Sequence, residues 1–192
     1  MAQVLSGKEI VGAMNERIHA QSDALRARGV VPTLAIVRVG ERPDDVFYER
    51  GAMKRCAATG VEVRNFVLPA DATQEALLAV LAEVNADRGI HGCLMFRPLP
   101  KHMDETLVCR ALDPAKDVDG ITEGSMAGVF TDTPLGFPPC TACACMEILD
   151  HYGIELAGKR AAVVGRSLVI GKPVAMMLLK KNATVTICHS KT

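Results

Sequence analysis

The stretch GRSLVIGKP, residues 165–173, combines residue types that can hold an anion. Gly165 and Gly171 let the backbone turn and approach a ligand closely, and Ser167 can donate a hydroxyl hydrogen bond. A helix that starts here would direct its N-terminus at the anion. The fingerprint G-x-G-x-x-G is missing, so the residues alone leave two interpretations: a modified phosphate-binding corner or a tight turn between strand and helix.

A cysteine cluster offers a second chemistry, metal binding. Cys140, Cys143 and Cys145 contain one C-x-x-C pair. A zinc site needs four ligands, usually from two such pairs or from a pair with matching histidines, and no second pair exists in the sequence. We therefore predict no metal, and expect small buried side chains at the start of a helix.

Composition limits the class of protein. The 22 basic residues balance 22 acidic ones and form no basic stripe with interleaved aromatics, so no nucleic-acid partner is expected. No segment approaches the roughly 18 apolar residues of a membrane span, and the N-terminus lacks a signal-peptide pattern. Seven cysteines, an odd number, fit a reducing compartment. We expect a cytoplasmic protein without a membrane partner.

The elements that must position these residues alternate along the chain. Ser6 and Glu9 form a capping-box pattern before a first helix. The apolar runs 33–39, 61–68 and 92–96 predict strands. Helices are expected between them, one after Pro43 and one capped by Asp71 or Thr73, followed by a short helix over 104–112. Strands that alternate with helices in this way predict an α/β fold with a parallel sheet.

A second region begins near residue 140. The stretch 113–139 is rich in Gly, Pro, Asp and Thr and is expected to be an irregular, functional loop. A helix over about 141–152 leads to a strand before Gly165, then to the corner, a helix and a strand over 183–188. A mononucleotide-binding half needs about three strands, so this sheet is incomplete.

Six motifs together resemble a known family. In chain order they are VGERPDDVFYERGAMK, HGCLMFRPLP, DPAKDVDG, PPCTACACMEIL, GRSLVIGKPVAMMLL and NATVTICHSKT. They resemble the successive motifs of the bifunctional methylenetetrahydrofolate dehydrogenase/methenyltetrahydrofolate cyclohydrolase family. The resemblance implies a three-layer, parallel-sheet folate domain over 1–140, followed by an incomplete Rossmann-like NAD(P) domain over 141–192. It also implies a tetrahydrofolate substrate and a homodimer.

The resemblance assigns roles to individual residues. It places Arg166 and Ser190 on the 2'-phosphate of NADP. NADP is therefore the expected cofactor, with NAD as the alternative. Gly165, Ser167 and Gly171 complete the cofactor-binding corner. A guanidinium is well suited to a phosphate. Tyr48 would stack on or orient the folate ring, and Asp119 would accept hydrogen bonds from its amino-pyrimidine edge. Pro98 and Leu99 would form one wall of the folate site.

The chain departs from the family at two positions. The family has a lysine four residues after the tyrosine and a glutamine before the Pro-Leu-Pro motif, where this chain has Ala52 and Phe96. Lys54 lies about 120° from Tyr48 around a helix, compared with about 40° for a residue four positions on. Arg97 would point to the opposite side of a strand from Phe96. Neither residue is expected to replace the missing groups.

The substitutions affect the two activities differently. Oxidation of the methylene carbon needs close approach of a nicotinamide and no base at that carbon, whereas hydrolysis of the methenyl cation needs positioned proton-transfer groups. We predict an NADP-dependent dehydrogenase with weak or absent cyclohydrolase activity. A fully bifunctional enzyme and a non-catalytic folate-binding homologue are the alternatives. Asp45, one helical turn before Tyr48, could favour the developing cation electrostatically.

Overall fold

The computed structural model describes residues 3–192, and these divide into two compact units. One unit is Ala13–Asp117, and the other is Val118–Thr192 with the described residues up to Gly12. This division groups residues by internal contacts. The predicted boundary near residue 140 divides the chain by expected ligand instead, folate before it and NAD(P) after it. That boundary therefore stays a prediction.

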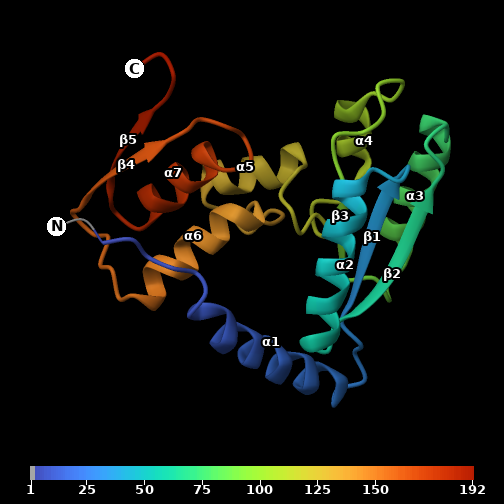
Figure 1. Cartoon of the computed structure of the whole chain (residues 1–192), viewed down its shortest axis with the longest axis horizontal. Coiled ribbons are helices and arrows are strands. Elements are labelled where there is room, and N and C mark those ends of the chain that lie inside the picture. The colour runs from blue at the N-terminus through green and yellow to red at the C-terminus, as the bar shows by residue number, and fades with distance from the viewer. Residues whose placement is uncertain (1–2) are drawn as a thin grey trace. The chain divides into compact units, whose positions relative to one another are not determined.

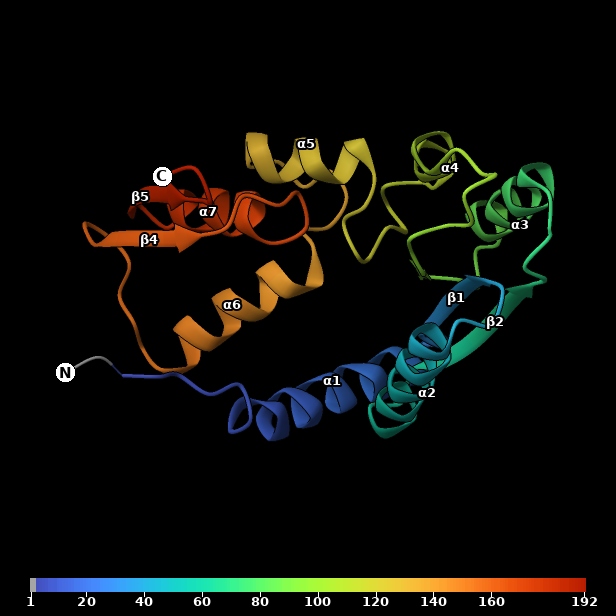
Figure 2. The ribbon, with the colours of Figure 1, turned by 45° about the horizontal axis from the view of Figure 1, so that its top comes forward.

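The unit Ala13–Asp117 is built on a three-stranded parallel sheet (Figure 1). The strand order is β2-β1-β3, and Leu34 of the central strand aligns with Val63 on one side and Gly92 on the other. Figure 2 shows α2 on one side of this sheet and α3 and α4 on the other. The elements are α1 (Ile10–Arg26), β1 (Thr33–Val39), α2 (Pro43–Ala58), β2 (Glu62–Leu68), α3 (Gln74–Ala86), β3 (Gly92–Met95) and α4 (Glu105–Ala111).

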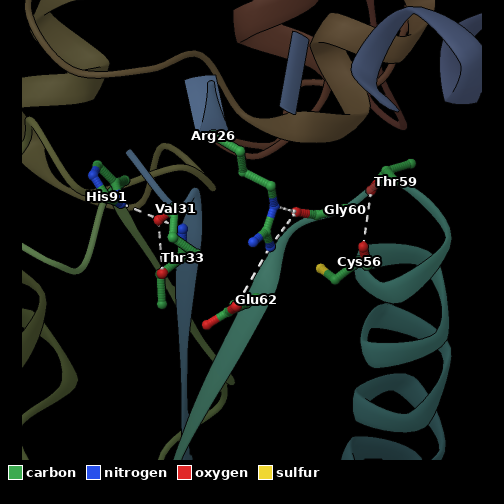
Figure 3. Close-up of polar contacts among 8 residues, drawn as sticks. All are labelled: Arg26, Val31, Thr33, Cys56, Thr59, Gly60, Glu62 and His91. Carbon is green, nitrogen blue, oxygen red and sulfur yellow. Dashed lines mark hydrogen bonds and ion pairs between the residues drawn. The ribbon is translucent and has the colours of Figure 1, made fainter. Parts of the chain in front are cut away.

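Polar contacts fasten the amino end of this sheet (Figure 3). Arg26, the last residue of α1, donates from Nη2 to the carbonyl oxygen of Gly60 at 3.0 Å and reaches Glu62 Oε1 at 3.4 Å. Across the sheet, the Thr33 N–H donates to His91 Nδ1 at 3.3 Å. The opposite, carboxyl end is therefore where loops are available for ligands, as is usual in open α/β sheets.

The second unit carries α5 (Glu123–Thr131), α6 (Cys140–His151), β4 (Arg160–Val164), α7 (Gly171–Lys180) and β5 (Thr184–Cys188). Strands β4 and β5 pair in parallel, with Ala161 opposite Val185. Helices α6 and α7 pack on the sheet face that carries Ala161, Val163 and Val185, and together they bury a small apolar core. The α/β class and the Rossmann-like second part predicted from the sequence are confirmed.

The cysteine cluster is less buried than predicted, since Cys140 is exposed and Cys143 and Cys145 are half-buried. Two predictions about helices were also wrong. The stretch 113–139 is not wholly irregular, because α5 forms within it: the Thr122 side chain accepts from the Ser125 N–H and caps the helix. Gly128 lets this short helix approach Leu135, whose carbonyl oxygen would lie 2.0 Å from an added Cβ. The Ser6 capping box does not form either, since Ser6 Oγ accepts from the Lys8 N–H and α1 begins only at Ile10.

Candidate active site

Tyr48 lies on α2, a helix whose start is determined by local sequence. Pro43 occupies the first turn, where its missing N–H costs nothing, and Asp44 and Asp45 complement the helix dipole there. The Tyr48 side chain is 63% exposed, while Phe96, which follows β3, is only 9% exposed. Their rings meet edge to face, with centroids 5.7 Å apart and planes at 82°. The position expected to hold a polar amide is thus filled by a ring that packs against Tyr48.

The Pro98-Leu99 segment is held on both sides. Arg42 donates from Nη1 to the carbonyl oxygen of Pro98 at 3.2 Å, and the Leu99 N–H donates to Glu105 Oε2 at 3.0 Å. The Arg97-Pro98 peptide bond is cis. Sequence reasoning missed Arg42 and Glu105. Only the Arg42-to-Asp45 spacing at a helix start could have drawn attention to the first, and nothing local indicated the second.

The two basic residues near Ala52 and Phe96, Lys54 and Arg97, do not take the place of the missing polar groups. Arg97 Nη1 lies 3.2 Å from Glu105 Oε1, so its charge is paired with α4. Lys54 is exposed on α2, whereas Ala52 is half-buried. The position that the family resemblance gives to a lysine therefore presents a methyl group.

Asp45 has a partner of opposite charge. Its Oδ2 lies 3.8 Å from Arg42 Nε, and its side chain is only 13% exposed. The guanidinium offsets part of the negative potential that Asp45 would otherwise project. Its expected role in stabilising a cation remains a prediction.

Asp119 belongs to the second unit and lies in a tight turn. Gly120 follows it with φ +65, and an added Cβ there would lie 2.6 Å from the backbone nitrogen of Pro139. Cys140 donates its thiol to the Val118 carbonyl oxygen at 3.2 Å. These contacts hold the half-buried Asp119 turn against the start of α6.

The corner between β4 and α7 needs its two glycines for different reasons. Gly165 has φ +135, a conformation that side chains disfavour. Gly171 has ordinary dihedrals, but an added Cβ would lie 2.2 Å from the Gly165 carbonyl oxygen. The glycines therefore let the strand end and the helix start touch, and the corner opens onto a hollow of about 430 Å³ lined in part by Arg166 and Ser167.

The first N–H groups of α7 are satisfied from within the corner. Ser167 Oγ accepts from the N–H groups of Ile170 at 3.0 Å and Gly171 at 3.3 Å, and its carbonyl oxygen accepts from Lys172 at 3.0 Å. Pro173 has no N–H. The helix end thus contributes its dipole, while hydrogen bonds to a phosphate would come from the Ser167 hydroxyl hydrogen and the Arg166 guanidinium.

Arg166 and Ser190 emerge at one edge of the small sheet. The Gly165 N–H donates to the Cys188 carbonyl oxygen at 2.8 Å and extends the β4–β5 pairing by one step. Arg166 and Ser190 follow these paired positions, and both are exposed. The arrangement leaves a cation and a hydroxyl beside the corner that could hold a phosphate.

Metal binding has no matching geometry in residues 3–192, where no three His, Cys, Asp or Glu side chains gather as a metal site would require. Burial raises the pKa of the Cys143 thiol, and its Sγ donates to the Pro138 carbonyl oxygen at 3.7 Å.

Within residues 3–192, no helix is long and apolar enough to cross a membrane.

Fold and site together define an α/β protein whose second part carries a glycine-rich strand-to-helix corner that could hold a phosphate. Residues 5–119 match the model of the tetrahydrofolate dehydrogenase/cyclohydrolase catalytic domain, and residues 139–192 match that of the NAD(P)-binding domain of the same enzymes. The chain belongs to the tetrahydrofolate dehydrogenase/cyclohydrolase family.

Curated relatives agree with this assignment. The chain is 52% identical over 192 residues to the bifunctional protein FolD of Carboxydothermus hydrogenoformans, covering all of this chain and 67% of the relative. It is 47% identical over 190 residues to the bifunctional protein FolD of Clostridioides difficile, covering 99% and 66%. The chain thus spans about two thirds of the length of these relatives.

Solved structures share the fold. The bifunctional FolD of Campylobacter jejuni superimposes with a TM-score of 0.94 at 34% identity, over 99% of this chain and 67% of that one. The Trypanosoma brucei methylenetetrahydrofolate dehydrogenase-cyclohydrolase, solved with NADP cofactor and an inhibitor, gives a TM-score of 0.89 at 34% identity, over 100% and 65%.

Proposed function

We propose that the protein oxidises 5,10-methylenetetrahydrofolate to 5,10-methenyltetrahydrofolate with NADP, and that its cyclohydrolase activity is weak or absent. Family membership supports the dehydrogenase reaction. The observation that carries the second part is the contact of Phe96 with Tyr48, because it puts an apolar ring where the family resemblance places a glutamine.

The nucleotide corner supports NADP as the cofactor. The close approach of Gly171 to Gly165 gives a cradle that a Cβ would fill, and Arg166 lies exposed beside it. Arg166 and Ser190 would hold the 2'-phosphate, and Ser167 would donate to the pyrophosphate. NADP, when bound, accepts the hydride that leaves the methylene carbon.

In the folate half, the chain's own residues orient the substrate. The Tyr48 ring packs edge to face with Phe96 but stays 63% exposed, so much of it is available to stack on the folate ring system. Pro98 and Leu99 form a wall whose backbone is fixed by Arg42 and Glu105. Asp119 would accept from the amino-pyrimidine donors. Orientation of this kind is what the oxidation requires.

Hydrolysis of the methenyl product makes a further demand. A group must take a proton from the attacking water, and a ring nitrogen must receive one as the bridge opens. Ala52 and Phe96 can do neither, and the Arg97 charge is paired with Glu105. Positioned proton-transfer groups contribute about 10²- to 10⁴-fold, so a loss of that size is expected.

The alternative is a fully bifunctional enzyme, and the names of the relatives favour it, since proteins 52% and 47% identical to this chain are called bifunctional. One experiment decides between the two. The purified protein is assayed for NADPH formation from methylenetetrahydrofolate, then for decay of added methenyltetrahydrofolate. We expect the second rate to fall at least about 100-fold below the first; comparable rates would establish the bifunctional alternative.

The homodimer and the cytoplasmic location expected from the family resemblance belong to the same proposal. Sedimentation equilibrium of the purified protein measures the first directly. A mass equal to one chain at micromolar concentration would contradict it.

A further inference from the structure

A buried ion pair lies directly beneath the helix that presents Tyr48. Arg38, near the carboxyl end of central strand β1, donates from Nε to Glu49 Oε2 at 2.6 Å, and both side chains are about one tenth exposed. The Arg38 Nη1 group also donates to the carbonyl oxygen of Gly40, where β1 turns toward α2. The other carboxylate oxygen of Glu49 accepts from Asn65 Nδ2 of β2 at 3.0 Å.

We propose that Arg38 and Glu49 are positioning residues for Tyr48. Glu49 is the next residue along α2, and its carboxylate is held by groups from two neighbouring strands. A side chain fixed in this way sets the rotation of the helix about its axis, and therefore the direction in which Tyr48 leaves it. Arg38 also fixes the Gly40 turn, so a single guanidinium controls both the entry to α2 and its orientation.

Stability alone does not account for this arrangement. A buried ion pair carries a desolvation cost that often equals its attraction, and well-packed apolar residues of similar volume commonly serve the fold as well or better. What the pair adds is direction, because Glu49 accepts through both carboxylate oxygens from two strands and such a hydrogen-bond network has one good geometry, whereas apolar packing tolerates several. The inference rests on the proposed function only in that Tyr48 contacts the folate. The orientation of Tyr48 by the Arg38–Glu49 pair does not depend on that function.

The test uses a matched pair of double variants in the full chain. Arg38→Met with Glu49→Leu removes the buried network, and Arg26→Met with Glu62→Leu removes an exposed ion pair of the same kind at the amino end of the sheet (Figure 3). Urea unfolding, the kcat of methylenetetrahydrofolate oxidation and the KM for NADP are measured on both. The chain contains only two tyrosines, Tyr48 and Tyr152, so fluorine NMR of 3-fluorotyrosine-labelled protein reports the Tyr48 ring without activity.

The first double variant is expected to keep a urea midpoint near that of wild type. Its kcat should fall at least about tenfold, since misplacement by about 1 Å can cost up to about 100-fold. The KM for NADP should not change, and the Tyr48 fluorine signal should shift or broaden while that of Tyr152 stays. The Arg26 and Glu62 variant should leave kcat and the Tyr48 signal unchanged.

An unmoved Tyr48 signal in the folded first variant would overturn the positioning role, whatever the activity. If that variant does not fold, Glu49→Gln, which keeps the side-chain shape, is read by the same fluorine signal and decides in the same way. Absence of oxidation in the wild-type protein would defeat the proposed function instead, and the fluorine result would still decide the geometric claim.

Discussion

The rings of Phe96 and Tyr48 meet edge to face with centroids 5.7 Å apart, and this contact joins the end of β3 to the middle of α2. An aromatic pair of this geometry contributes roughly 0.5–1.5 kcal/mol beyond its buried area. It also excludes water and polar groups from one side of Tyr48. The folate half of the candidate site is thereby better suited to orientation than to proton transfer.

Restoring the polar groups should restore hydrolysis. Ala52→Lys combined with Phe96→Gln is expected to raise the rate of methenyltetrahydrofolate decay by about 10²-fold or more, because it supplies a proton-transfer group and an amide beside Tyr48. The measurement is the loss of methenyl absorbance. Lys54→Ala, on the exposed side of α2, is the control and should change nothing. A wild-type rate in the double variant would contradict the assignment of these positions.

Removing the Arg166 charge should weaken NADP binding selectively. Arg166→Gln is expected to raise the KM for NADP by about 10- to 100-fold, since a charge-assisted hydrogen bond contributes about 1.5–3 kcal/mol. The KM for NAD, which lacks the 2'-phosphate, should change little. Arg160→Gln, at the other end of β4, controls for net charge. Equal losses for both nucleotides would show that Arg166 does not select the phosphate.

Gly171→Ala should damage both the fold and the corner. The new Cβ would lie 2.2 Å from the Gly165 carbonyl oxygen, which is backbone and cannot move aside without shifting the corner. Overpacking of this kind costs about 1–3 kcal/mol, read as a lower urea midpoint together with a higher KM for NADP. Gly12→Ala in α1 meets nothing within 4 Å and should stabilise by about 0.5–1 kcal/mol. A neutral Gly171→Ala would mean that the two segments need not touch.

Thiol reactivity should separate the cysteines by burial. Burial raises the pKa of the Cys93 thiol to about 12, and the Asp117 carboxylate adds to the shift while Lys116 opposes it. The thiolate is the reactive form, so alkylation of Cys93 should stay negligible from pH 7 to 9 and rise only near pH 12 or on unfolding. The exposed Cys140 should react first in iodoacetamide labelling followed by peptide mass spectrometry. Early modification of Cys93 in folded protein would contradict its burial.

Local sequence signals determined a large part of this protein. Alternating apolar runs and turn residues located the strands and most helices, because periodicity and caps act within a few residues of each other. The corner at residues 165–173 was visible for the same reason, since its glycines and Ser167 lie close in sequence. The sequence left Asp71 and Thr73 as alternative caps of α3. The tertiary structure decides for Thr73, whose side chain accepts a hydrogen bond from the Ala76 N–H.

Tertiary structure alone decided how distant residues meet. No local pattern placed Phe96 on Tyr48, paired Arg97 with Glu105, or set Arg38 beneath Glu49, because these contacts depend on how separate elements pack. The short helix α5 was missed for a related reason: its small and polar residues carry weak periodicity, and its position depends on Gly128 fitting against Leu135. Patterns along the chain report local conformation, whereas the chemistry of a site depends on which side chains packing brings within reach.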